Sequence, residues 1–210
     1  MAISLISGFI LVGGASSRMG TDKALLMFEG QTFIERIATE LSKVTNSIAL
    51  VGRANENFDL NLPAVPDVYE RCGAIGGIHG ALSACQSPWA LIVACDLPFV
   101  NRSLFAHLAE LRENFDAVVP IQVDGRPQPL CALYARTPCL SQAEYLIKSG
   151  ERKPLGLLQS VSTRWVQFSE LEHLTGHDHF FDNINTPQDY ARANQEGVSA
   201  RDVVVRQREG

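Results

Sequence analysis

The chain lacks several patterns that define common protein classes. Its 210 residues contain no apolar run of the roughly 18 to 20 residues that a membrane-spanning helix needs. Its five cysteines form no Cys-x-x-Cys pair and are odd in number, which disfavours a structural zinc site or a disulfide framework. Excess positive charge is missing as well, since the net charge is −5 and general nucleic-acid binders are usually basic. We therefore expect a cytoplasmic protein with reduced thiols that does not bind nucleic acid or membranes.

Length and composition indicate one globular domain. Apolar residues make up 46% and charged residues 20% of the chain, and 210 residues suffice for a sizeable core. The first twelve residues are apolar but lack the basic start of a signal peptide, so we interpret them as a first strand. We expect residues 1–196 to form the domain and residues 197–210 to be a disordered tail or an added edge strand.

Short apolar runs alternate with helical patterns along the chain. The expected strands are Ser7–Val12, Ser47–Val51, Trp89–Ala94, Ala117–Ile121, Pro129–Tyr134 and Thr163–Phe168. The expected helices are Phe33–Val44, Gly77–Ala84, Ser103–Arg112, Thr137–Lys148 and a last one that starts at Thr186–Pro187. This alternation predicts an α/β fold, a Rossmann-like three-layer α/β/α sandwich with a mostly parallel central sheet.

The most informative segment follows the first expected strand. Residues 11 to 23 read Leu-Val-Gly-Gly-Ala-Ser-Ser-Arg-Met-Gly-Thr-Asp-Lys. Glycines let backbone N–H groups approach an anion closely, and Arg18 and Lys23 add positive charge where a polyphosphate would lie. A Walker A loop does not fit, because it needs a lysine directly after its last glycine and here a threonine follows the third glycine. A dinucleotide-binding fingerprint does not fit either, because it needs Gly-x-Gly and here the first two glycines are adjacent. We favour phosphate binding here over an ordinary strand-to-helix turn.

Further polar residues follow the other expected strands. Asp96 comes two residues after a buried strand, where an unpaired carboxylate is costly and a divalent cation bound with phosphates would satisfy it. By itself, Asp96 fits a turn before Pro98 equally well. Asp67 precedes the glycine-rich segment Gly73–Gly77, whose entry into a helix would offer free N–H groups to an anion. Alone, Asp67 would be interpreted as a surface carboxylate.

Two segments of the C-terminal half carry candidate polar ligands. Asn183 and Asn185 lie two residues apart and would point to the same side of an extended segment. The Asn-Thr-Pro sequence also makes a good helix start without any ligand. Arg152 and its neighbour Lys153 supply two cations, although exposed basic pairs are usually solvated surface.

These motifs together resemble a known family. Leu-x-Gly-Gly-x-x-x-Arg-Met-Gly-x-Asp-Lys is a nucleotidyltransferase signature, and within that superfamily the chain resembles the molybdenum-cofactor guanylyltransferases, the MobA family. The family's Cys-Asp-x-Pro and Asn-x-Asn-Thr-Pro motifs follow in the same order at residues 95–98 and 183–187. The resemblance spans about residues 5 to 193 and implies the fold of the nucleotide-diphospho-sugar transferases.

The resemblance implies a role for each candidate residue. GTP would be bound by Leu11, Val12, Gly13, Gly14, Lys23, Gly52, Asp67, Gly73, Gly77 and Asp96. The acceptor would be bound by Arg152, Asn183 and Asn185, and the catalytic residues would be Arg18, Lys23 and Asp96. Asp96 would hold the metal cofactor, Mg²⁺ or alternatively Mn²⁺.

The implied reaction is transfer of GMP from GTP to the phosphate of molybdopterin or its molybdenum-bound form, with release of pyrophosphate. A pterin-delivery protein and molybdoenzyme chaperones are implied as partners. The alternatives are a cytidylyltransferase or another nucleotidyltransferase of this fold, and a non-catalytic GTP-binding adaptor that delivers the cofactor. The adjacent Gly13 and Gly14 favour GTP, since cytidylyl relatives tend to have Ala-Gly there.

Some features depart from the family pattern or carry no assignment. Val12 stands where alanine is usual, and Ala74 stands where the family's glycine segment has proline. His177-Asp178-His179 has the composition of a metal cluster, but it lies in a polar stretch with no third ligand identified, and we expect a surface loop there. No spacing supports a Ser/His/Asp or Cys/His nucleophile.

Overall fold

The structure of the chain is a computed structural model that describes residues 5–12, 25–52, 61–69, 71–184 and 188–190. The strands are β1 (Ile6–Val12), β2 (Met27–Phe28), β3 (Gln31–Thr32), β4 (Ser47–Gly52), β5 (Ala64–Val65), β6 (Trp89–Ala94), β7 (Ala117–Pro120), β8 (Cys131–Ala135) and β9 (Thr163–Val166). The helices are α1 (Phe33–Leu41), α2 (Gly73–Ala84), α3 (Arg102–Glu110), α4 (Arg136–Lys148) and α5 (Pro154–Ser160).

A seven-stranded sheet with the order β5-β4-β1-β6-β8-β7-β9 forms the centre of the fold. All neighbouring strands are parallel except β8, which is antiparallel to both β6 and β7. The chain between β7 and β8 has no crossover helix, and so short a connection reverses the chain direction. The predicted mostly parallel sheet is confirmed.

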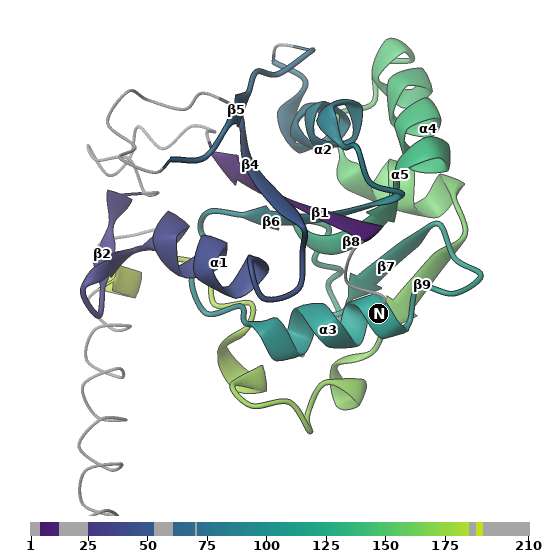
Figure 1. Ribbon diagram of the computed structural model, residues 1–210. Helices are drawn as coiled ribbons and strands as arrows, with labels where there is room; N and C mark the ends of the chain where they lie inside the picture. Colours follow the sequence, from purple (N-terminus) through teal and green to yellow (C-terminus); the bar gives the residue numbers. More distant parts are fainter. Residues whose placement is uncertain (1–4, 13–24, 53–60, 70, 185–187, 191–210) are drawn as a thin grey trace, which may run out of the picture.

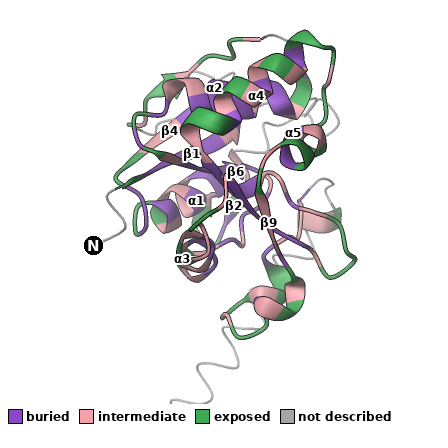
Figure 2. Cartoon of the chain, turned by 90° about the vertical axis from the view of Figure 1, so that its right-hand side faces the viewer, coloured by how far each residue is buried: buried purple, intermediate pink, exposed green. Residues whose placement is uncertain are grey.

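Helices cover both faces of this sheet (Figure 1). Alternation along β1 directs Ile6, Ile10 and Val12 to the core shared with α1 and α3. Phe9 faces the opposite core, which the sheet shares with α2, α4 and α5. Figure 2 shows the central strands buried and the outward sides of the helices exposed. The predicted three-layer α/β/α arrangement is therefore confirmed.

Local sequence explains where the helices begin. Thr32 and Glu35 form a capping box at α1, with the Glu35 N–H donating to the Thr32 hydroxyl at 3.2 Å and the Thr32 N–H donating to the Glu35 carboxylate at 2.6 Å. Asn101 caps α3 by accepting the Ser103 N–H at 3.0 Å. Helix α5 starts with a proline in its first turn and was not predicted.

Several predicted boundaries were wrong. Helix α2 begins at Gly73 rather than Gly77, so the glycine-rich segment is the first turn of the helix and not a turn before it. Helix α1 ends at Leu41, three residues before the predicted end at Val44. The β2–β3 hairpin and β5 were missed, because their two-residue strands leave no periodic pattern in the sequence. Residues 185–187 lie outside the described part, and the residues that follow, 188–190, are helical.

All five cysteines lie in the described part of the chain. Cys72, Cys85, Cys95, Cys131 and Cys139 are all buried, and none of them forms a disulfide. Burial raises the pKa of the Cys139 thiol to about 12, so this sulfur is an inert core group rather than a nucleophile. None of the helices described has the length and apolarity that a membrane crossing requires.

Candidate functional site

The candidate site lies where the strand order reverses. From β1 the chain continues to β4 on one side of the sheet and later to β6 on the other, so β1 and β6 flank the switch point. In open α/β sheets, ligands bind beyond the carboxyl ends of the strands at this point. The Cys95 N–H donates to the Leu11 carbonyl at 3.1 Å, which ties the two strand ends together. The end of β1 and the segment with Asp96 are therefore neighbours.

The carboxyl ends of β1 and β4 also meet closely. Val12 pairs with Gly52 in parallel register. Gly52 has a φ of +108°, and a Cβ built on it would lie 2.1 Å from the Val12 carbonyl oxygen. Only glycine fits this position. The Val12 side chain is buried in the core on the α1 face, so the valine that replaces the usual alanine packs in the core.

Helix α2 lies against the same strand ends. A Cβ at Gly77 would be 3.3 Å from the Leu11 side chain, so the missing side chain lets the helix sit directly on β1. The Asp67 carboxylate lies 3.9 Å from the Cβ position of Gly80, one turn further along α2. The N-cap residue of α2, Cys72, makes no side-chain hydrogen bond to the first turn in the part of the chain that the structure describes. The first N–H groups of a helix have no partner within the helix, so this turn is suited to an anion at this edge of the sheet.

Arg152 approaches the site through its backbone. Its carbonyl oxygen lies 3.4 Å from the Cβ position of Gly73, at the start of α2. The guanidinium donates to the carbonyl oxygens of Glu151 at 2.8 Å and Ile147 at 3.2 Å, and the residue is exposed. The guanidinium therefore lies against the last turn of α4, with donors left for a further anion, while the Arg152 backbone lies beside the start of α2.

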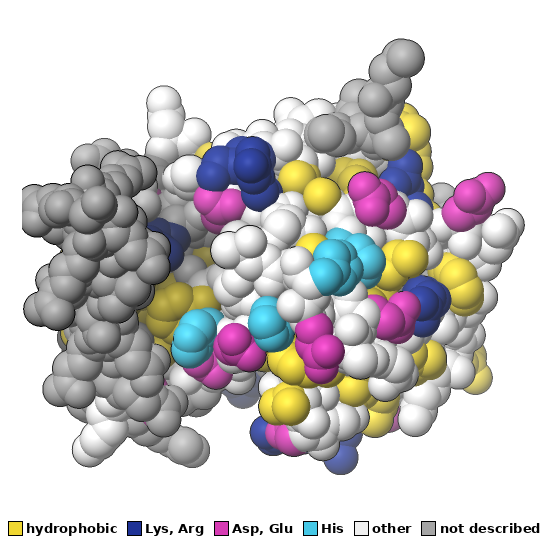
Figure 3. Space-filling model, turned by 90° about the horizontal axis from the view of Figure 1, so that it is seen from below, with side chains coloured by type: hydrophobic (Ala, Val, Ile, Leu, Met, Phe, Trp, Pro, Cys, Tyr) yellow, Lys and Arg dark blue, Asp and Glu magenta, His cyan; other side chains and the backbone are white. Residues whose placement is uncertain are grey.

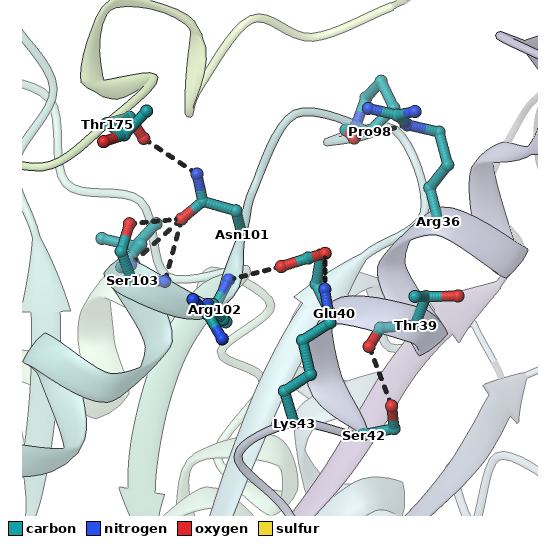
Figure 4. A network of polar contacts seen from close by, with 11 residues as sticks. Arg36, Thr39, Glu40, Ser42, Lys43, Pro98, Asn101, Arg102, Ser103 and Thr175 are labelled. Atoms are coloured by element: carbon teal, nitrogen blue, oxygen red, sulfur yellow. Dashed lines mark hydrogen bonds and ion pairs between the residues drawn. The ribbon is translucent and has the colours of Figure 1, made fainter.

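The loop that follows Asp96 is held from two sides (Figure 4). From α1, Arg36 donates to the Pro98 carbonyl at 3.4 Å, and Glu40 accepts the Arg102 N–H at 2.8 Å. Asn101 donates to the Thr175 carbonyl at 2.9 Å from the other side. Burial alone would raise the pKa of Glu40, but hydrogen bonds from Lys43 and the Arg102 N–H lower it, so the carboxylate stays charged.

Asn183 is brought to Asp96 by the backbone of its neighbour. The Ile184 N–H donates to the Asp96 carbonyl at 3.2 Å. The Ile184 side chain is buried in a small apolar cluster that we call the anchor cluster. Its members are Leu26, Phe28, Phe33, Phe99, Ile184 and Tyr190. Phe28 and Phe99 stack edge to face at 5.4 Å, and the Tyr190 hydroxyl donates to the Met27 carbonyl. The anchor cluster therefore fixes the Asn183 segment, the Asp96 loop and the β2–β3 hairpin together.

Phe99→Leu is expected to loosen this arrangement without unfolding the protein. Losing the edge-to-face contact should lower the free energy of unfolding by about 1 kcal/mol. Because Phe99 holds the segment of Asn183, which the sequence predicts to bind the acceptor, the KM for the acceptor should rise several-fold while the KM for the nucleotide changes less. Phe168→Leu is the matched control, since Phe168 contacts the His177 ring at 5.9 Å and lies outside the cluster. Equal KM values in both variants would contradict a positioning role for Phe99.

The structure brings together most of the predicted site residues that it describes. Leu11, Val12, Gly52, Asp67, Gly73, Gly77, Asp96, Arg152 and Asn183 lie on the segments that meet at this edge of the sheet. Gly13, Gly14, Arg18, Lys23 and Asn185 lie outside the described residues. The predicted binding roles of both groups stay predictions.

The histidines form no metal centre in the part of the chain described. The predicted loop at 177–179 is a short 3₁₀ turn, in which His179 Nδ1 lies 2.9 Å from an Asp182 carboxylate oxygen. The His107 and His173 rings meet edge to face, with their centroids 5.2 Å apart. Figure 3 shows histidines among Asp and Glu side chains on the face seen from below. Burial lowers the pKa of His107, which favours the neutral form of this ring near pH 7. No described group of three His, Cys, Asp or Glu residues has a metal-binding arrangement.

Two features of the site region were not predicted. One is the anchor cluster, whose members are too far apart in the sequence to share a periodic pattern. The other is a cavity of about 270 Å³ between α1, the Asp96 loop and the 3₁₀ turn, lined by Arg36, Glu40 and His179 among others. No predicted site residue that the structure describes lines this cavity.

Comparison with known proteins agrees with the motifs. The family described as "MobA-like NTP transferase domain" matches residues 8–164. A "probable molybdenum cofactor guanylyltransferase" of Pelotomaculum thermopropionicum is 34% identical over 89% of this chain and 91% of its own length. One of Clostridium perfringens is 33% identical over 88% and 93%.

Solved structures show the same likeness. The crystal structure of molybdopterin-guanine dinucleotide biosynthesis protein A from Archaeoglobus fulgidus has a TM-score of 0.77 and 28% identity, over 92% of this chain and 99% of that one. A 2-C-methyl-D-erythritol 4-phosphate cytidylyltransferase from Thermus thermophilus has a TM-score of 0.64 at 18% identity, over 89% and 96%, and shares the fold. The resemblance in the sequence motifs is thus confirmed, and the chain belongs to the MobA-like NTP transferase family.

Proposed function

We propose that this protein transfers GMP from GTP to the terminal phosphate of molybdopterin, with or without bound molybdenum. The observation that carries the proposal is the hydrogen bond between the ends of β1 and β6. It sets Leu11, where the segment of residues 11 to 23 begins, beside Asp96 at the switch point of the sheet. The Ile184 N–H bond to Asp96 adds the Asn183 segment, which we assign to the acceptor. The names of the relatives support the same substrates.

The reaction needs no nucleophile from the protein. An oxygen of the acceptor phosphate attacks the α-phosphorus of GTP in line, forming a new P–O bond as the bond to the β-phosphate oxygen breaks. Pyrophosphate leaves with the electron pair. Catalysis then consists of positioning and of offsetting negative charge. We propose that Arg18 and Lys23 offset the negative charge that develops on the leaving pyrophosphate. We propose that Asn183, Asn185 and Arg152 bind the acceptor.

Magnesium fits the residues at this edge. Mg²⁺ is usually held by one or two carboxylates together with substrate phosphates, and Asp96 is a partly buried carboxylate at the end of β6. When bound, the ion supplies positive charge against the phosphate oxygens. We propose Mg²⁺ as the cofactor and Asp96 as its ligand, with Mn²⁺ as an alternative ion.

Pyrophosphate release tests the proposal directly. Purified protein with Mg²⁺ and molybdopterin is supplied with GTP, CTP or ATP. We expect release with GTP, dependent on the pterin and abolished by a chelator. A preference for CTP would assign the protein to cytidylyl transfer. Binding of GTP without release would favour a delivery adaptor, and either result would overturn the proposal.

A further inference from the structure

The segment from Pro66 to Tyr69 lies directly on one face of α2. A Cβ at Gly80 would be 3.8 Å from the Pro66 carbonyl oxygen and 3.9 Å from a carboxylate oxygen of Asp67. A Cβ at Gly76, one turn earlier, would be 3.1 Å from the Tyr69 carbonyl oxygen. Residues four apart share a face of a helix, so the two glycines let this segment approach α2 closely. Asp67, which the sequence predicts to bind the nucleotide, is therefore carried on α2.

An aromatic contact with His79 holds the segment at Tyr69. His79 lies between the two glycines in the sequence of α2 and is 5% exposed. The Tyr69 and His79 rings meet edge to face, with their centroids 4.9 Å apart. Aromatic pairs in this geometry stabilise a structure by more than their buried area alone explains. The Tyr69 hydroxyl also donates to the Glu144 carboxylate of α4 at 3.4 Å, so this ring is held from two helices.

The buried His79 ring favours its neutral form. Burial lowers the pKa of His79 more than the Glu144 carboxylate raises it, and Lys148 lowers it as well. The ring Nδ1 lies 3.4 Å from the Ser83 hydroxyl oxygen, one turn further along α2. A neutral ring offers no positive charge to a phosphate, so its contribution is the packing contact with Tyr69.

We propose that His79 is a positioning residue for nucleotide binding, which acts by holding Tyr69 and with it the Asp67 carboxylate at the carboxyl edge of the sheet. This role rests on the proposed function, which brings GTP to that edge. Asp67 is fixed on one side by Val65, which pairs with Val51 of β4. Tyr69 is the fixed point on the other side, only two residues away. Loosening Tyr69 therefore lets the Asp67 carboxylate move.

His79→Leu tests the proposal, because leucine fills much of the buried space and removes the aromatic contact. The KM for GTP should rise about five- to tenfold while kcat changes less than about twofold, the pattern of an interaction lost equally from the ground state and the transition state. His79→Phe keeps an aromatic ring and should restore most of the affinity. Ser83→Ala is the matched control, since it removes only the polar contact of the ring, and its KM should be unchanged.

Tyr69→Leu breaks the same contact from a half-buried position and keeps the test valid if a change at the buried His79 prevents folding. It should raise the KM for GTP by a similar factor. Tyr69→Phe keeps the ring and loses only the contact with Glu144, so its KM should stay close to that of the wild type. An unchanged KM for GTP in Tyr69→Leu would overturn the proposal.

The Asp67→Ala background decides whether His79 acts through Asp67. The affinity for GTP is measured by titration in Mg²⁺. His79→Leu should weaken GTP binding in the wild-type background but no further in Asp67→Ala, whereas it should lower the melting temperature equally in both. Additive losses of affinity would indicate a general structural effect and overturn the proposal. An unchanged affinity in Asp67→Ala alone would overturn it as well.

The same titrations separate the role of His79 from the proposed function. If wild-type protein binds GTP but releases no pyrophosphate with the pterin, the proposed function fails and the GTP affinities still decide on His79. If wild-type protein releases pyrophosphate and His79→Leu binds GTP equally well, the role of His79 alone fails. If wild-type protein binds no GTP, both proposals fail.

Discussion

Asp96→Asn is expected to lower the rate of nucleotidyl transfer about 1000-fold, equivalent to about 4 kcal/mol of transition-state stabilisation. Asparagine keeps the size of the side chain and leaves the backbone carbonyl of residue 96 free to accept the Ile184 N–H. What is lost is the negative charge that we assign to the metal at the end of β6. The measurement is the rate of pyrophosphate release under single-turnover conditions across a range of Mg²⁺ concentrations.

A change in fold would be a trivial cause of such a loss, so the melting temperature is measured in parallel and should stay close to that of the wild type. Asp178→Asn is the matched control. The Asp178 side chain is 73% exposed, on the 3₁₀ turn outside the site. Its only expected effect is the loss of a weak surface contact with His177. If Asp96→Asn retained a near-normal rate, Asp96 would not be the metal ligand.

Long, regular elements could be predicted because their residues carry the pattern themselves. The apolar run of β6 marks a strand buried on both faces. Helix α2 could only be predicted in part, because glycine is a poor helix former and its first turn is rich in glycine. That turn is helical because Gly77 lets it pack directly on Leu11, a tertiary contact that overrides propensity. The reversed direction of β8 likewise depends on the strands beside it.

The site could be predicted where its residues follow strands along the chain. Asp96 and Gly52 were found in this way, since the carboxyl ends of parallel strands meet at one edge. The anchor cluster could not be predicted in this way, because Phe28, Phe99 and Ile184 are far apart in the sequence and meet only in the fold.

Among substitutions that add one methyl group at the site, Gly52→Ala is expected to destabilise the protein most. The new Cβ would lie 2.1 Å from the Val12 carbonyl oxygen, and the φ of +108° is strained for any residue with a side chain. Relief requires β4 to move away from β1 at Val12, the last residue before Gly13. We expect a loss of about 4 kcal/mol in the free energy of unfolding. GTP affinity should fall at least tenfold, because the backbone that we assign to the nucleotide shifts with Val12.

Gly30→Ala separates the clash from the backbone strain. Gly30 has a φ of +81° in the tight turn of the β2–β3 hairpin, and nothing lies within 4 Å of its Cβ position. Alanine there should cost only about 1 kcal/mol, the usual penalty for a left-handed residue with a side chain. Urea denaturation of both variants measures how much free energy of unfolding each one loses. We attribute the difference between the two losses to the overlap of the new Cβ at residue 52 with the Val12 carbonyl oxygen. Equal losses would mean that β1 and β4 separate easily at this edge, and the nucleotide segment would then not depend on Gly52 for its position.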